Sequence, residues 1–348
     1  MTPFSNVKLL RHLDAIEAWR HGKWHAPIQV EIDLTNECSS RCPFCYGYLK
    51  RELSHHILLA DGETMEEKLR SSESRTRSLI DDLSAIGVKS ILFTGGGDPT
   101  MHRRWKSLVA HAASKRLEVG LITNGVVDVS DVVEHCTWIR FSVDAASSDL
   151  YSIQHGRREH FPVVIDSVRR AVSRKAESNS RCTIGVGFLT GKQTSHEIRK
   201  FVELWSCIDV DYIQFRPLID SYGDKWFDGS DEVIKEIDAA RAMDPRVVAS
   251  DQKYSGFDGY GKTEKCYGIF FETAIAADGL VYTCCNHKGV AKYAIGNLHI
   301  EPFRQIWERH LASGEFSVTE DCPRFCRHFG NNRLVDLIVR PQMHENFI

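Results

Sequence analysis

Short apolar, β-rich runs alternate with amphipathic helical patterns six times along the first two thirds of this chain. The runs are 28–34, 91–94, 119–123, 138–143, 183–189 and 211–218. Between them, apolar residues recur at helical spacing, as in Leu79, Ile80 and Leu83. Strands that alternate with helices in this way form a parallel sheet covered by helices. We therefore predict an α/β fold, a partial (β/α)6 barrel of the TIM type, over residues 28–242.

Three further segments complete the predicted domain organisation. Residues 1–27 contain one amphipathic pattern and are expected to form an N-terminal helical extension. Residues 243–265 are polar and rich in glycine, which is typical of a linker. Residues 266–348 are rich in cysteine and contain two strand-like runs joined by Asp278-Gly279, a strong hairpin signal. We predict that they form a small appendage of a β-hairpin and a helix.

Composition restricts the class of function. The chain has 348 residues and a net charge of −3, which excludes a strongly basic nucleic-acid coat, and we expect no nucleic-acid partner. No apolar run approaches the length of a membrane span, and the N-terminus lacks the order of a signal peptide. We predict a cytoplasmic protein that does not associate with membranes. A polar segment, 46–75, interrupts the first strand–helix unit and is either a lid or a loop.

Cysteine is the most informative residue type. The count of 11 is odd, and without a secretion signal a disulfide framework is not expected. Directly after the first predicted strand, Cys38, Cys42 and Cys45 stand in a C-x3-C-x2-C pattern. Three thiolates on one loop can hold a 4Fe–4S cluster and leave one iron open to another molecule. A zinc site with a distant fourth ligand uses the same residue types, and spacing alone leaves it open.

Motifs on successive strands resemble those of the radical S-adenosylmethionine (radical SAM) superfamily. The third cysteine of the loop is preceded by an aromatic residue, and TGGGDPT, TNG, FSVDA and IGVGFLT follow in the order typical of that family. The resemblance implies a 4Fe–4S cluster on Cys38, Cys42 and Cys45, bound S-adenosylmethionine, and a site at the carboxyl ends of the strands. The implied cofactor-binding residues are Phe44, Gly95, Gly96, Gly97, Asp98, Pro99, Asn124, Ser142, Asp144 and Arg157. Asp98 stands where the family commonly has glutamate, and Arg158 is the alternative to Arg157.

A second group of cysteines lies in the predicted appendage. Seventeen residues separate Cys266 from Cys284, and Cys322-x3-Cys326 follows. Four thiolates would saturate either an iron–sulfur cluster or a zinc ion. The segment resembles the twitch and SPASM domains that hold auxiliary clusters in radical SAM enzymes, although it ends in C-x3-C rather than C-x2-C. The resemblance implies one auxiliary 4Fe–4S cluster bound by these four cysteines, with the choice between Cys284 and Cys285 left open.

Two further residues are candidates for direct chemistry. Cys285 would stand free beside the auxiliary cluster, where it is either a hydrogen donor or a small buried side chain. Arg216 ends the sixth strand and is expected to contact a polar substrate at the barrel mouth or to join strand to loop. The histidines His155, His287 and His328 are expected to be surface or packing residues.

The resemblance favours a radical SAM enzyme similar to aminocyclitol dehydrogenases and sugar epimerases of antibiotic pathways. A saturated auxiliary cluster is expected to relay an electron, so we predict oxidation of an alcohol carbon in a sugar, aminocyclitol or nucleoside-like small molecule. An external donor such as flavodoxin or ferredoxin would supply electrons. Epimerisation with a cysteine donor and peptide modification are the enzymatic alternatives. Only about 27 residues precede the first strand, which weighs mildly against a leader-binding peptide enzyme. A zinc or iron–sulfur protein without catalysis is the remaining alternative.

Overall fold

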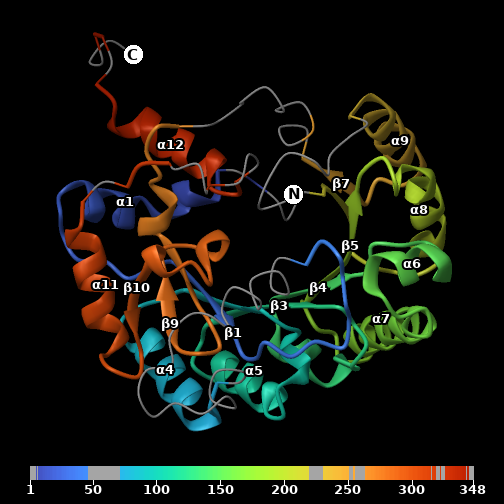
Figure 1. Ribbon diagram of the computed structural model, residues 1–348, viewed down its shortest axis with the longest axis horizontal. Coiled ribbons are helices and arrows are strands. Elements are labelled where there is room, and N and C mark those ends of the chain that lie inside the picture. The colour runs from blue at the N-terminus through green and yellow to red at the C-terminus, as the bar shows by residue number, and fades with distance from the viewer. Residues whose placement is uncertain are drawn as a thin grey trace.

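All six predicted strands form in the computed structural model. It describes residues 5, 7–45, 71–218, 230–250, 254, 263–314, 316–318, 322, 326–341 and 343–344. The strands are β1 (Gln29–Asp33), β2 (Ser90–Thr94), β3 (Glu118–Thr123), β4 (Trp138–Ser142), β5 (Thr183–Thr190) and β6 (Tyr212–Pro217). They pair in parallel and in sequence order. The α/β fold, a partial barrel of the TIM type, is thereby confirmed (Figure 1).

Helices cover the outer face of this curved sheet (Figure 1). They are α4 (Glu73–Ala85), α5 (Trp105–Ser114), α6 (Ser148–His155), α7 (His160–Glu177), α8 (Ile198–Ser206) and α9 (Ser230–Met243). Each contributes apolar side chains to one continuous core with the outward-facing residues of the strands, such as Ile139 and Phe141 of β4. Because strand side chains alternate between faces, Arg140 and Ser142 of the same strand point into the barrel. The barrel interior is therefore polar where the outer core is apolar.

The segment 243–265, expected as a linker, contains a seventh parallel strand, β7 (Val247–Ala249), which pairs with β6. Only Val247 and Val248 supply the apolar character of this strand, and polar residues surround them. Pairing with Ile213 and Phe215 on an edge that already exists lets so short a run form a strand. Periodicity over a longer window does not detect it.

The cysteine-rich appendage continues the same sheet rather than standing apart from it. Its strands are β8 (Glu272–Ile275), β9 (Leu280–Tyr282) and β10 (Ala294–Asn297), and the β8–β9 turn holds Gly279 at φ +82°, as the hairpin motif predicts. β8 pairs in parallel with β1, and two helices follow, α11 (Phe303–Ala312) and α12 (Phe329–Val339). The appendage therefore closes one side of the barrel next to its first strand.

The N-terminal extension packs against the appendage. It consists of the 3-10 turn η1 (Lys8–His12) and helix α1 (Leu13–Arg20), as the sequence pattern predicts. Leu9 and Ile16 join a second core that includes Cys266, and the ring of Trp19 stacks on Phe270 at 5.6 Å. Residues 46–70 of the polar segment 46–75 lie outside the described residues, so its role as a lid stays a prediction. In the described ranges, no helix has both the length and the apolar composition of a membrane span.

Candidate functional site

The first three cysteines lie on the loop that follows β1, at the carboxyl end of the barrel strands. The backbone N–H of Cys45 donates to the Cys42 carbonyl at 3.0 Å, which curls the loop. The Cys38 sulfur accepts from the backbone N–H of Ser40 at 3.4 Å and from Asn124 Nδ2 at 3.6 Å. Burial raises the pKa of the Cys42 thiol far above its ordinary value, and the neighbouring Cys45, Asp144 and Cys38 add to the effect. Crowded thiols with donors aimed at sulfur fit a metal centre that would keep them as thiolates.

His155, at the end of α6, is part of this site. Its Nδ1 lies 3.3 Å from the Cys42 sulfur, and its Nε2 lies 3.0 Å from the Val143 carbonyl and 3.3 Å from Asp144 Oδ2. Its side chain is only 3% exposed, and its carbonyl accepts from the backbone N–H of Arg41. His155 is thus not a surface residue; it packs on the ring of Tyr151 at 4.4 Å, as expected of a packing residue, and in addition contacts the cysteine loop. The contact spans 113 positions in the sequence, and no local motif signals it.

The glycine loop after β2 packs against the cysteine loop. Gly97 N–H donates to the Thr35 carbonyl at 2.9 Å, and Asp98 N–H donates to the Glu37 carbonyl at 2.8 Å. A Cβ atom on Gly96 would lie 2.0 Å from Asn36 Oδ1, and one on Gly97 would lie 2.0 Å from the Glu37 carbonyl oxygen. Glycine is therefore required at both positions for the two loops to meet.

The carboxylate of Asp98 joins the loops after β2 and β3. Oδ1 accepts from Thr100 N–H at 3.0 Å and from the Thr100 hydroxyl at 2.5 Å. Oδ2 accepts from the Thr123 hydroxyl at 3.0 Å and from Asn124 N–H at 2.6 Å. Burial raises the pKa of Asp98 although these donors oppose the shift. Asp98 thus fixes the residues that touch Cys38, and Pro99 begins the short turn η2 (Pro99–Met101) beside it.

The other predicted cofactor residues lie around the same end of the barrel. Asp144 adopts φ +56° and accepts from Leu189 N–H at 2.8 Å, which ties β4 to β5. Ser142 pairs with Gly187 across the same two strands. Phe44 lies partly buried on the cysteine loop, and Arg157 is also partly buried, with its guanidinium 3.8 Å from Glu159. Their contacts with S-adenosylmethionine stay predictions.

Four cysteines of the appendage lie close together around the start of α12. Cys266 and Cys284 are buried, and burial raises the pKa of both thiols; Cys322 adds to the effect at Cys266, and Cys285 and Cys326 add to it at Cys284. The Cys326 sulfur accepts from Asn286 Nδ2 at 3.6 Å and from the backbone N–H of His328 at 3.4 Å. The sulfur of Cys322 lies 3.7 Å from Nε2 of the buried His287. The environment of these thiols fits a metal centre, as at the first loop.

Neither His287 nor His328 is a surface residue, since both are at most 2% exposed beside the appendage cysteines. Among the described side chains, no group of three or more His, Cys, Asp or Glu converges as the ligands of one ion do.

Cys285 lies in a different environment from Cys284. Burial raises the pKa of its thiol to about 12, and the charges that act on it belong to Arg327, Glu31, Glu272 and Lys288. The charges that act on Cys284 belong chiefly to other cysteines. This difference supports the assignment of Cys284 to the cluster and of Cys285 to the barrel side, which stays a prediction.

A charged bridge, defined as Glu31, Asp33, Glu272, Lys288 and Arg327, connects β1 with the appendage. Lys288 Nζ lies 2.7 Å from Glu31 Oε1 and 2.7 Å from Asp33 Oδ1. Arg327 pairs with Glu31 at 3.3 Å and also with Glu272. Burial and the Glu31 charge raise the pKa of Asp33 to about 6, whereas Lys288 and Arg327 together outweigh burial and lower that of Glu31. The two carboxylates differ because Arg327 supports only Glu31.

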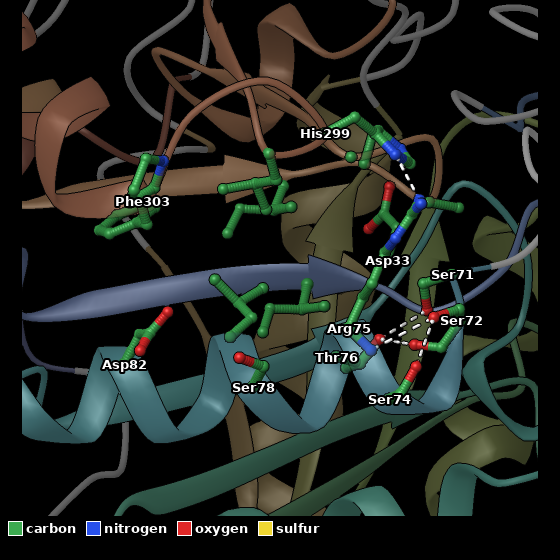
Figure 2. A pocket seen from close by; sticks show the side chains of 18 of the residues that line it. Asp33, Ser71, Ser72, Ser74, Arg75, Thr76, Ser78, Asp82, His299 and Phe303 are labelled. Atoms are coloured by element: carbon green, nitrogen blue, oxygen red, sulfur yellow. Dashed lines mark hydrogen bonds between the residues drawn. The ribbon is translucent and has the colours of Figure 1, made fainter. Parts of the chain in front are cut away.

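A cleft of about 510 Å³ lies between α4 and the appendage, and Asp33 of the charged bridge is one of its lining residues (Figure 2). Its lining includes Ser72, Arg75, His299 and Phe303, and no cysteine. Arg75 contacts the ring of His299 across the cleft (Figure 2). Because it holds neither thiols nor the cysteine loops, we place the chemistry at the barrel interior instead.

Two protein-family models match the chain, and each contains one cysteine group. The model described as the radical SAM superfamily matches residues 32–204, and the SPASM iron–sulfur cluster-binding domain matches residues 266–328. The first domain implies a 4Fe–4S cluster and S-adenosylmethionine, and the second implies auxiliary iron–sulfur binding. Both agree with the environments of the thiols described above.

Named relatives share parts of the chain. It is 26% identical over 175 residues to Fe-coproporphyrin III synthase of Methanosarcina barkeri and 30% identical over 131 residues to PqqA peptide cyclase of Xanthomonas euvesicatoria. The matched segments cover 50% and 35% of this chain, but only 40% and 32% of those proteins. Streptococcus suis SuiB bound to its precursor peptide SuiA shares the fold with a TM-score of 0.64, at 14% identity over 90% of this chain and 72% of that one. None of the three is an aminocyclitol dehydrogenase or a sugar epimerase, so that finer resemblance is not supported.

Proposed function

We propose that this chain, which is a radical SAM enzyme with a SPASM domain, modifies a peptide by removing hydrogen from it. The observation that carries the proposal is the 30% identity over 131 residues to a protein named as a peptide cyclase. The fold likeness to SuiB, solved with a precursor peptide, extends through both domains and supports the same substrate class. Peptide modification, which the sequence left open as an alternative, therefore replaces alcohol oxidation as the favoured hypothesis for the function.

The proposed reaction uses the two cysteine groups for separate tasks. When bound, S-adenosylmethionine and its cluster supply the 5′-deoxyadenosyl radical that abstracts a hydrogen atom, and the auxiliary cluster accepts an electron. The peptide would lie in the polar barrel interior between the two cysteine groups. The charged bridge, which connects β1 with the appendage, lies on the same side of the sheet. Asp33, with its pKa of about 6, is the interior carboxylate suited to hold the proton that the substrate loses. An oxidative cross-link formed in this way leaves the peptide two hydrogens lighter.

The test uses protein reconstituted anaerobically with iron and sulfide and reduced with dithionite. Synthetic peptides of each short open reading frame beside the gene are supplied with S-adenosylmethionine, in parallel with myo-inositol, glucose and adenosine. We expect at least one peptide to increase 5′-deoxyadenosine formation and to lose two hydrogens by mass spectrometry. Cys42→Ala is the matched control and should give neither product.

The opposite pattern contradicts the proposal. If one of the small alcohols increases 5′-deoxyadenosine formation and is converted to a ketone, and no peptide is modified, the result would favour the dehydrogenase hypothesis. A small molecule of unchanged mass that gains deuterium from deuterated buffer would indicate epimerisation. The cytoplasmic location and the use of flavodoxin or ferredoxin as electron donor stay predictions.

A further inference from the structure

Two arginines on non-adjacent strands point into the barrel. Arg140 on β4 is opposite Gly185 of β5, and Arg216 near the end of β6 is opposite Leu189 of β5. Both positions alternate with outward-facing core residues, so both side chains face the interior. A Cβ atom on Gly187 would lie 3.6 Å from Arg140 Cδ. The Arg140 side chain therefore runs along the strands toward their carboxyl ends, where Arg216 stands.

Neither guanidinium has an acidic partner among the described residues. The Nε atoms of Arg140 and Arg216 are both buried and make no hydrogen bond within those ranges. The contact recorded for the Arg140 guanidinium is a long one, from Nη1 to Gln214 Oε1 at 3.3 Å. Burial, and then the charge of Arg216, lower the pKa of Arg140 to about 9. Two half-buried guanidinium groups whose Nε atoms are buried, and which form no ion pair among the described residues, suit an anion from outside the chain.

The carboxylates nearest to this pair already have other partners. Asp144 accepts from Leu189 N–H and contacts His155. Glu31 is bound by Lys288 and Arg327 in the charged bridge. Neither acid is free to turn toward the arginines without leaving another buried group unpaired. In the part of the chain that the structure describes, these two acids are therefore not partners of the arginines, which leaves that place to a ligand.

We propose that Arg140 and Arg216 bind a carboxylate of the substrate, with Gln214 as a neutral neighbour. The planar guanidinium fork suits a carboxylate and gives orientation as well as affinity. The inference rests on the proposed function for the identity of the ligand as a peptide. That carboxylate is an acidic side chain or the free C-terminus. The pair faces the barrel interior from β4 and β6, on the far side of the sheet from β1 and the appendage, so it would fix which part of the peptide faces the radical.

S-adenosylmethionine also carries a carboxylate, so the experiment separates the two sources. Reconstituted protein is saturated with S-adenosylmethionine, and binding of glutarate and of neutral glutaramide is measured by calorimetry. Acetyl-Gly-Glu-Gly-amide is compared in the same way with acetyl-Gly-Gln-Gly-amide, and acetyl-Gly-Gly-Gly with a free C-terminus tests the second form. The variants are Arg140→Gln, Arg216→Gln and Arg140→Lys, with the exposed Arg199→Gln as the matched control.

We expect the wild type and Arg199→Gln to bind glutarate and one carboxylate peptide at least about tenfold more tightly than the neutral partners. Both glutamine variants should lose this preference, and Arg140→Lys should keep only part of it. Their affinity for S-adenosylmethionine should stay unchanged. A further variant, Arg140→Met, tests whether Arg140 stabilises the fold. It removes a charge that has no ion-pair partner among the described residues, so it should not lower the Tm of the ligand-free protein; if Arg140 had a structural role, Tm would fall.

Three results would overturn the inference. The first is no preference for carboxylates in the wild type, and the second is a preference that survives in both glutamine variants. The third is a loss of S-adenosylmethionine affinity in those variants, which would assign the pair to the cofactor. Arginine-dependent binding of glutarate with no binding of either carboxylate peptide would support the anion site and contradict the peptide substrate, so the two proposals fail separately.

Discussion

Replacing Lys288 by methionine should destabilise the protein severely, because this side chain compensates two carboxylates inside the barrel. Its Nζ lies 2.7 Å from both Glu31 and Asp33, and all three side chains are at most 10% exposed. Methionine keeps the length of the stem and removes only the charge. Removing one partner of a buried ion pair costs about 3–5 kcal/mol. For a chain of 348 residues we expect Tm to fall by about 4–7 °C.

Asp33→Asn is the matched control, since it removes one of the two negative charges rather than the shared positive one. The raised pKa of Asp33, about 6 against 3.8, means that the folded state holds a proton that the unfolded chain has already lost. Wild-type stability is therefore fully present below about pH 4 and decreases by about 3 kcal/mol as pH rises to about 6. Asp33→Asn should lack this decrease and should therefore be more stable than the wild type at pH 8, by up to about 3 kcal/mol.

The assay is thermal unfolding of the three proteins between pH 5 and pH 8, followed by tryptophan fluorescence under anaerobic conditions. If the Tm of Lys288→Met lies within about 2 °C of that of the wild type at pH 8, Lys288 does not compensate two buried carboxylates. An Asp33→Asn variant that loses as much stability as Lys288→Met would also contradict the prediction. The first result would mean that the bridge is solvated rather than buried, and the second would mean that ionised Asp33 stabilises the fold.

Three further predictions concern the cysteine sites. His155→Ala should lower the reduction potential of the cluster held by Cys42, because an iron-bound sulfur can only accept from the ring; an electron paramagnetic resonance titration that finds the potential unchanged would contradict this. Asp98→Ala leaves the buried N–H of Asn124 without its acceptor and should cost about 1–3 kcal/mol, seen as a lower Tm with less iron retained. Cys285→Ala should keep its full iron content after reconstitution, whereas equal loss of iron in Cys285→Ala and Cys284→Ala would contradict the assignment of ligands.

The sequence predicted the fold well wherever the pattern was long and local. Each of the six strands is either continuously apolar, such as 91–94, or alternates apolar and polar residues, such as 28–34, and the Asp278-Gly279 turn has a conformation that few other residue pairs adopt. β7 was missed because two valines suffice once a neighbouring strand is present. Local patterns thus reveal elements that would form with little help, and not those that depend on a partner.

The site was predictable from the sequence only where the spacing of neighbouring residues identifies it. The C-x3-C-x2-C loop is visible in eight residues, whereas the contact of His155 with Cys42 depends on the whole barrel. The motif 194–197 predicts a capping box, yet Glu197 instead accepts from Ala146 N–H at 2.7 Å. No helix-capping bond forms from Thr194. The Glu197 carboxylate therefore binds a backbone N–H that is distant in the sequence instead of capping its own helix.

The role of the first cysteine loop is tested most directly by the formation of 5′-deoxyadenosine from S-adenosylmethionine by reduced, reconstituted protein without added substrate. We expect product from the wild type and from Cys284→Ala, because cleavage requires only the first cysteine loop, and no product from Cys42→Ala. Cleavage retained in Cys42→Ala would contradict the assignment of Cys38, Cys42 and Cys45 as the cluster ligands, and with it the central claim.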